Sequence, residues 1–147
     1  MDPKQAICWS IAFPGFGQLL NKRYVKGLVL LTLEILVNIQ ANFNKAIILS
    51  FQGDIKEAIA ITNYQWLMFY PCLYFFSMWD AYKEAGGGKN RYSFLPFVFS
   101  AYFVTIGLMY STTGRIFGKV LGPVWFPMIF VIPGLIVGFI LMKIWSK

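Results

Sequence analysis

Long apolar stretches alternate with short polar segments along most of the chain. An α-helix needs about 20 consecutive apolar residues to cross the hydrocarbon core of a membrane. Four stretches approach that length, and they cover residues 27–43 (or as far as 51), 64–80, 94–113 and 123–142. The pattern therefore predicts an all-α, polytopic integral membrane protein with about four transmembrane helices.

Residues 6–20 form a further, shorter apolar stretch, which Pro14, Gly15 and Gly17 interrupt in its middle. The parts on either side of the interruption are too short to cross a membrane. We expect a broken or re-entrant element whose turn needs glycine for positive φ angles or close backbone contacts. Gln18 is expected to hydrogen-bond the broken backbone. If the element instead crosses fully, the chain has five spans and the N-terminus lies outside.

A glycine-rich segment at residues 83–93 separates two halves that each contain two of the long stretches. Three consecutive glycines give this segment high backbone freedom. We expect one transmembrane domain over residues 1–147. Its parts are the broken N-terminal element 1–26, a helical hairpin 27–82, a cytoplasmic loop 83–93 and a second hairpin 94–147.

The composition supports the membrane class, because 58% of the residues are hydrophobic and only 13% are charged. Soluble domains carry about 25% charged residues. The composition excludes a soluble globular domain and a disordered chain. It also excludes a soluble nucleic-acid-binding protein, although the net charge is +7.

The chain has no histidine and only two cysteines, Cys8 and Cys72, both in apolar stretches. This pattern excludes a disulfide framework and a zinc site with the usual ligand spacing. Histidine is also the side chain most often used as a general base near neutral pH. We predict a non-enzymatic protein with no catalytic residues, no metal and no cofactor.

The basic residues are distributed unevenly between the polar segments. If the N-terminal element returns to its own side, one side holds nine of the 13 basic residues. These nine are Lys4, Lys22, Arg23, Lys26, Lys83, Lys89, Arg91, Lys143 and Lys147, and the other four are Lys45, Lys56, Arg115 and Lys119. The positive-inside rule then predicts a multi-pass protein of the cell membrane with both termini in the cytoplasm.

Glu34 lies seven residues after Gly27, which places it about 10 Å into the first span. A charged carboxylate at that depth is costly unless it is paired, hydrated or protonated. A polar stripe, defined as Glu34, Asn38, Asn42 and Lys45, is predicted on one helix face. It indicates either a hydrogen-bond ladder between helices or a path for ions, protons or a polar solute.

Two other patterns indicate contacts between spans. Asp80 ends the second span and is expected to form inner-face ion pairs with Arg23 and Lys22, either to pin a loop or to act on a lipid headgroup. Gly134 and Gly138 are spaced for close helix packing. Pro71 and Pro133 fall in mid-span and are expected to kink their helices. Arg115 and Lys119, spaced as one helical turn, are expected in an interfacial segment.

The chain has a Pro-Gly-x-Gly-Gln turn at residues 14–18, Tyr24 and Lys26-Gly27 before the first span, and Trp-Asp-Ala-Tyr at 79–82. With these motifs, residues 1–85 resemble the small bacterial membrane proteins related to the TM2 domain. The resemblance implies a membrane hairpin module and supplies no catalytic residues. Residues 86–147 have no counterpart in that pattern.

The polar segments are too short to hold a separate catalytic or sensory domain. The sequence therefore favours an accessory, scaffold or regulatory subunit of a membrane complex. Its expected partners are the lipid bilayer and another membrane protein or a second copy, with no nucleic acid. The alternatives are an oligomeric channel or transporter that uses the polar stripe, and a lipid-modifying enzyme that uses Asp80 and Arg23.

Overall fold

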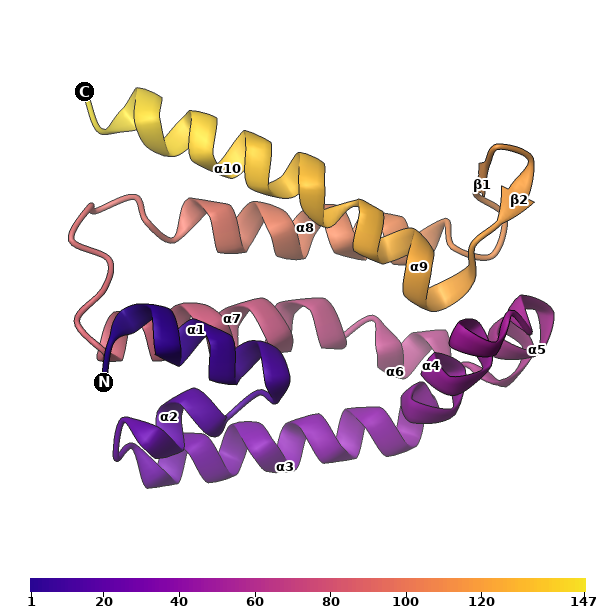
Figure 1. Cartoon of the computed structure of the whole chain (residues 1–147), viewed down its shortest axis with the longest axis horizontal. Helices are drawn as coiled ribbons and strands as arrows, with labels where there is room; N and C mark the ends of the chain where they lie inside the picture. Colours follow the sequence, from indigo (N-terminus) through magenta and orange to yellow (C-terminus); the bar gives the residue numbers. More distant parts are fainter.

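The computed structural model describes residues 1–147, and most of them are helical (Figure 1). The helices are α1 (Pro3–Ala12), α2 (Phe16–Leu20), α3 (Tyr24–Ala41), α4 (Phe43–Gln52), α5 (Ile55–Ile61), α6 (Tyr64–Leu67), α7 (Tyr70–Glu84), α8 (Leu95–Met109), α9 (Gly122–Ile129) and α10 (Val131–Trp145). A small antiparallel pair, β1 (Arg115–Ile116) and β2 (Lys119–Val120), connects α8 to α9. The helical class predicted from the sequence is confirmed.

The long helices lie side by side and define two ends of the molecule (Figure 1). Both chain termini, the turn between α2 and α3 and the loop between α7 and α8 lie at one end, called here the termini end. The helices α4 and α5 and the β1–β2 hairpin lie at the opposite end, called here the hairpin end. Because α1 runs away from the termini end and α2 runs back toward it, the N-terminal element reverses direction as expected.

Two helical stretches are long and apolar enough to cross a membrane by length and composition, namely Tyr24–Ala41 and Gly122–Trp145. The second comprises α9 and α10, which a short break at Phe130 separates. The helix α8 is also apolar but has only 15 residues. Two candidate spans are compatible with a membrane protein, and the expected number of four stays a prediction.

The first predicted span ends earlier than its apolar pattern indicates. Asn42 adopts a left-handed conformation with a φ of 57° and separates α3 from α4. Asparagine tolerates this conformation better than most residues with a side chain. The Nδ2 group of Asn42 donates a hydrogen bond to the carbonyl of Ile61, 2.9 Å away, which fixes the break against the end of α5.

The apolar stretches contain prolines that were expected to kink helices in mid-span. Pro71 is the second residue of α7, and Pro133 is the third residue of α10. Proline is tolerated in the first turn of a helix because the missing N–H group has no intrahelical partner there. Each apolar stretch is thus interrupted within one turn before its proline, at residues 68–69 and at Phe130, as expected for a proline in mid-span, which removes the hydrogen bond to the residue four positions earlier.

The segment around Arg115 and Lys119 is a β-hairpin, so the expected helical spacing of these residues is wrong. Ile116 pairs with Lys119 across the hairpin. Phe117 and Gly118 form the turn with φ angles of 51° and 77°, as a two-residue hairpin turn requires. The Phe117 side chain is fully exposed at the tip of this hairpin.

The helices α8 and α10 pack closely where two glycines face α8. A Cβ atom at Gly134 would lie 2.7 Å from the Cα atom of Ser100, and one at Gly138 would lie 2.7 Å from the backbone nitrogen of Pro96. These neighbours are backbone atoms, so they have little room to move aside. The two glycines thus provide the close helix packing that their spacing indicates.

Candidate functional site

The N-terminal turn is held by glycines that leave no space for side chains. Gly15 has a φ of 102°, and a Cβ atom there would lie 2.6 Å from the carbonyl oxygen of Gly27 on α3. At Gly17, a Cβ atom would lie 2.6 Å from the Cβ atom of Ala81 and 2.9 Å from the carbonyl oxygen of Ala6. The turn therefore packs against α1, α3 and α7 at the same time. Pro14 is fully buried beside it.

Hydrogen bonds connect this turn to α7. The backbone N–H of Gly15 donates to Oγ of Ser77 at 3.1 Å. The buried Gln18 side chain donates through Nε2 to the carbonyl of Ser77 at 2.9 Å and to Oδ2 of Asp80 at 3.1 Å. Gln18 was expected to bond the broken backbone of the turn, but Ser77 has that role and Gln18 instead links α2 to α7.

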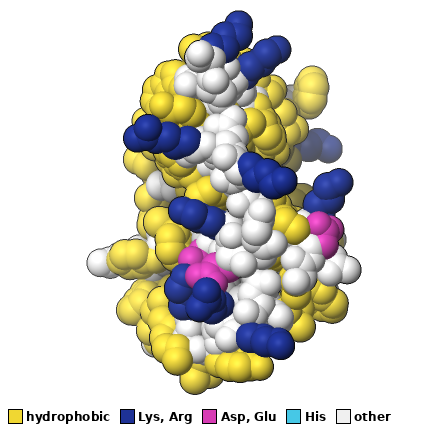
Figure 2. Space-filling view, turned by 90° about the vertical axis from the view of Figure 1, so that its left-hand side faces the viewer, with side chains coloured by type: hydrophobic (Ala, Val, Ile, Leu, Met, Phe, Trp, Pro, Cys, Tyr) yellow, Lys and Arg dark blue, Asp and Glu magenta, His cyan; other side chains and the backbone are white.

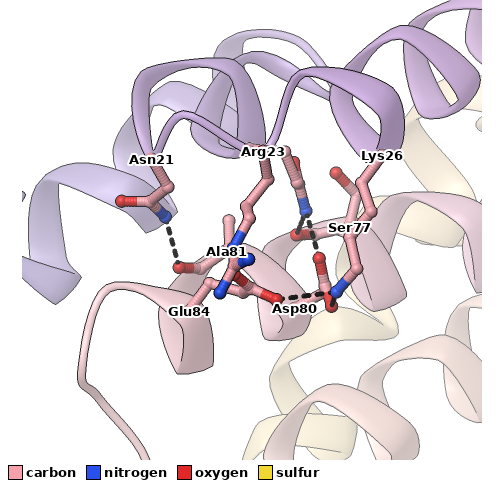
Figure 3. A network of polar contacts seen from close by, with 8 residues as sticks. Asn21, Arg23, Lys26, Ser77, Asp80, Ala81 and Glu84 are labelled. Atoms are coloured by element: carbon pink, nitrogen blue, oxygen red, sulfur yellow. Dashed lines mark hydrogen bonds and ion pairs between the residues drawn. The ribbon is translucent and has the colours of Figure 1, made fainter.

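An ionic network at the termini end ties the start of α3 to the end of α7 (Figure 3). Nζ of Lys26 lies 2.8 Å from Oδ1 of Asp80 and 2.7 Å from Oε1 of Glu84. Arg23 donates a hydrogen bond to the second carboxylate oxygen of Glu84. Asn21 donates to the carbonyl of Ala81 at 3.0 Å and extends the network by one more contact.

The electrostatics of the network favour its ionised form. The hydrogen bond from Lys26, together with that from Arg23, lowers the pKa of Glu84 below its ordinary value. The carboxylates are largely covered, with side-chain exposures of 15% and 16%, whereas Lys26 is half exposed. Since half-exposed ion pairs contribute little free energy, the network mainly fixes how α3 sits on α7.

The expected partners of Asp80 need correction. Its cationic partner is Lys26, while Arg23 pairs with Glu84. Lys22 forms no ion pair and adopts a φ of 62° in the turn before α3. Sequence reasoning did not single out Glu84, although Asp80 and Glu84 are four residues apart on one helix, and so face the same side. This four-residue spacing could have indicated from the sequence that Glu84 joins Asp80 in the ionic network.

The polar stripe is interrupted in the structure. Glu34 is only 3% exposed on α3, and its Oε2 atom has no hydrogen-bond partner. Asn38 instead bonds Asn44 beyond the helix break, at 3.0 and 3.1 Å. Lys45 lies exposed on α4. The expectation that Lys45 continues the face of Glu34 is wrong, because α3 ends before it.

A large apolar groove lies between the two halves of the chain. Its volume is about 760 Å³, and 20 of its 26 lining residues are hydrophobic. One wall comes from α1 and α7, with Ile11 and Phe75, and the other from α8, α9 and α10, with Val104 and Leu135. Lining residues extend from Tyr82 near the termini end to residues of α4 at the hairpin end. No sequence signal indicated this groove, since packing between distant helices creates it.

No group of three or more Cys, Asp or Glu side chains is placed to hold a metal ion. No family model matches the chain, and comparisons with curated proteins and with solved structures gave no match. The resemblance to proteins related to the TM2 domain thus stays a prediction. Any function must be argued from the groove, the N-terminal turn, the ionic network and Glu34.

Proposed function

We propose that the chain is a multi-pass membrane protein with both termini in the cytoplasm, and that it acts without catalysis as an accessory or scaffold subunit of a membrane complex. The observation that carries this proposal is the amount of apolar side chain left on the surface. On α3, Val25 is 79% exposed and Ile39 is 66% exposed, and on α10 Ile132 is 61% exposed. Lipid or a partner helix is the environment that such surfaces require.

The distribution of charge along the molecule supports the proposed orientation. The termini end carries nine basic and three acidic residues, whereas the hairpin end carries four basic and two acidic residues. Figure 2 looks onto the termini end, where dark-blue basic side chains are spread over the surface and acidic side chains are few. By the positive-inside rule, this end faces the cytoplasm.

The accessory role is supported by what the polar parts of the chain offer. The segment between α7 and α8 covers only residues 85–94, and the hairpin between α8 and α9 is about as short. Neither segment holds a separate domain. Partners must therefore be met along the helices or at the termini end.

A channel or transporter is the second candidate, and Glu34 favours it. A buried carboxylate with an oxygen that lacks a partner is typical of an ion or proton site. The interruption of the polar stripe at Asn42 argues against a path that continues along α3. Glu34 is then a local polar contact inside the bundle, unless several copies of the chain assemble a path between them.

The proposed topology predicts which positions react with a membrane-impermeant thiol reagent in intact cells. In a background with Cys8→Ala and Cys72→Ala, a cysteine at exposed Gln52 should react, because the hairpin end faces outward. Cysteines at Lys89 and Ser146 should react only after the membrane is permeabilised. Labelling of Lys89→Cys in intact cells contradicts the proposed orientation.

Purification of the tagged full chain from a mild detergent distinguishes the two candidate functions. An accessory subunit should co-purify with one membrane protein in a fixed ratio, measured by mass spectrometry of the intact complex. An assembly that contains only copies of this chain, and that conducts ions in liposomes, supports the transport function instead. The variant with Cys8→Ala and Cys72→Ala serves as the matched control. It retains every helix contact described above and should therefore purify in the same assembly as the wild type.

A further inference from the structure

The size of the apolar groove limits what it can hold. A transmembrane helix about 10 Å wide and 30 Å long occupies on the order of 2,400 Å³. The groove offers about 760 Å³, which is too little to enclose a whole helix. If a chain carbon takes about the 30 Å³ of a liquid water molecule, roughly 25 carbons fit. The groove can therefore enclose a hydrocarbon chain, whereas a partner helix would lie mostly outside it.

The termini end of the groove differs from the rest of its lining because several cations lie near it. Ser93 lines the groove there, and its Oγ atom is buried without a hydrogen-bond partner, as is that of Ser100 further along the lining. The lining residues Tyr82 and Met142 are each followed in the sequence by an exposed lysine, Lys83 and Lys143.

Two of the cations at this end lie beside aromatic rings. The Lys83 ammonium lies 5.5 Å from the centre of the Trp79 ring, and the Arg91 guanidinium lies 6.0 Å from that of Tyr92. Aromatic and basic side chains together are typical of the level at which lipid headgroups lie. At the hairpin end, Lys45 alone lies within two residues of the lining. Asp80 and Glu84 also lie within two residues of the lining at the termini end, but they pair with Lys26 and Arg23. Because Lys83, Arg91 and Lys143 form no ion pair, charge favours an anionic headgroup at the termini end.

We propose that the groove binds one hydrocarbon chain of an anionic phospholipid, with its phosphate between Lys83, Arg91 and Lys143. This inference rests on the proposed membrane location. The apolar walls exclude water from the bound chain, and the cations select the charge of the headgroup. The bound lipid fills the space between the two halves of the protein and joins them.

The test reconstitutes the full chain in nanodiscs with equal amounts of phosphatidylglycerol and phosphatidylcholine. The lipid retained after purification in mild detergent is then measured by mass spectrometry. The wild type should retain phosphatidylglycerol in excess. Val104→Trp fills the groove and should lower the retained lipid roughly tenfold, because the ring displaces apolar contact with the chain. Val98→Trp is the matched control on the same helix, at a 51% exposed position, and should match the wild type.

A triple variant, Lys83→Gln, Arg91→Gln and Lys143→Gln, tests the headgroup separately. It leaves the groove intact and should retain lipid without preferring phosphatidylglycerol. If Val104→Trp is not monodisperse, Leu135→Phe replaces it, because Leu135 lines the same groove. Equal lipid retention by the wild type and the folded groove variant overturns the proposal, as does a preference that survives the triple variant. Cysteine labelling reports the membrane location independently, so a correct topology without retained lipid overturns only the lipid site.

Discussion

Gly17→Leu is expected to abolish the accumulation of folded protein. A Cβ atom at this position already lies too close to the Ala81 side chain and the Ala6 carbonyl, and leucine adds three more carbons. Overpacking in a well-packed core costs about 1–3 kcal/mol even where side chains can move. Here α2 is trapped between α1 and α7, so the cost should exceed that range and consume much of a stability of about 5–15 kcal/mol. Fluorescence-detected size-exclusion chromatography of a fluorescent fusion measures the folded yield.

A graded series separates this effect from general sensitivity of the N-terminal element. Gly17→Ala should give an intermediate yield, because it introduces only the Cβ atom. Leu20→Met is the matched control on α2, since Leu20 is 49% exposed, and it should accumulate like the wild type. If Gly17→Leu elutes as a monodisperse peak at the wild-type yield, α2 does not pack between α1 and α7 as described.

Local signals explain the parts of the fold that the sequence predicts. Proline and glycine at residues 14–17 constrain the backbone directly, so the break between α1 and α2 follows from the residue types alone. The apolar stretches likewise locate α3, α8 and α9–α10, because length and hydropathy are properties of one segment. The exposed apolar surfaces of α3 and α10 are consistent with the same pattern.

Contacts between segments explain most of what the sequence did not predict. Asp80 faces Lys26 and not Lys22 because of how far α3 is rotated against α7, and no single segment contains that information. The end of α3 at Asn42 depends on a hydrogen bond to Ile61, 19 residues away. The β1–β2 hairpin places Phe117 at a positive φ, a conformation that its residue type does not favour.

The candidate sites also differ in whether local signals or contacts between distant segments determine them. The glycines of the N-terminal turn and of the α8–α10 contact were predicted because spacing and residue type suffice for them. The apolar groove was not, because its walls come from helices as far apart in the sequence as α1 and α10, with lining residues from Ile7 to Met142. The proposed lipid site thus depends on how the two halves pack, and the contact between α8 and α10 builds one of its walls.

Gly138→Leu is expected to break that contact and to lower the thermal stability strongly. A Cβ atom at Gly138 would lie 2.7 Å from the backbone nitrogen of Pro96 and 2.8 Å from the carbonyl of Leu95. Backbone atoms in the first turn of α8 cannot rotate away as a side chain can, so α10 must move outward. A cost of about 3 kcal/mol corresponds to a fall in Tm of roughly 10 °C for a chain of this length, measured in detergent. Ile136→Leu, at a 54% exposed position on the same helix, should melt with the wild type. If Gly138→Leu also melts with the wild type, α10 does not lie against α8 at this point, and the groove has lost the wall on which the proposed lipid site depends.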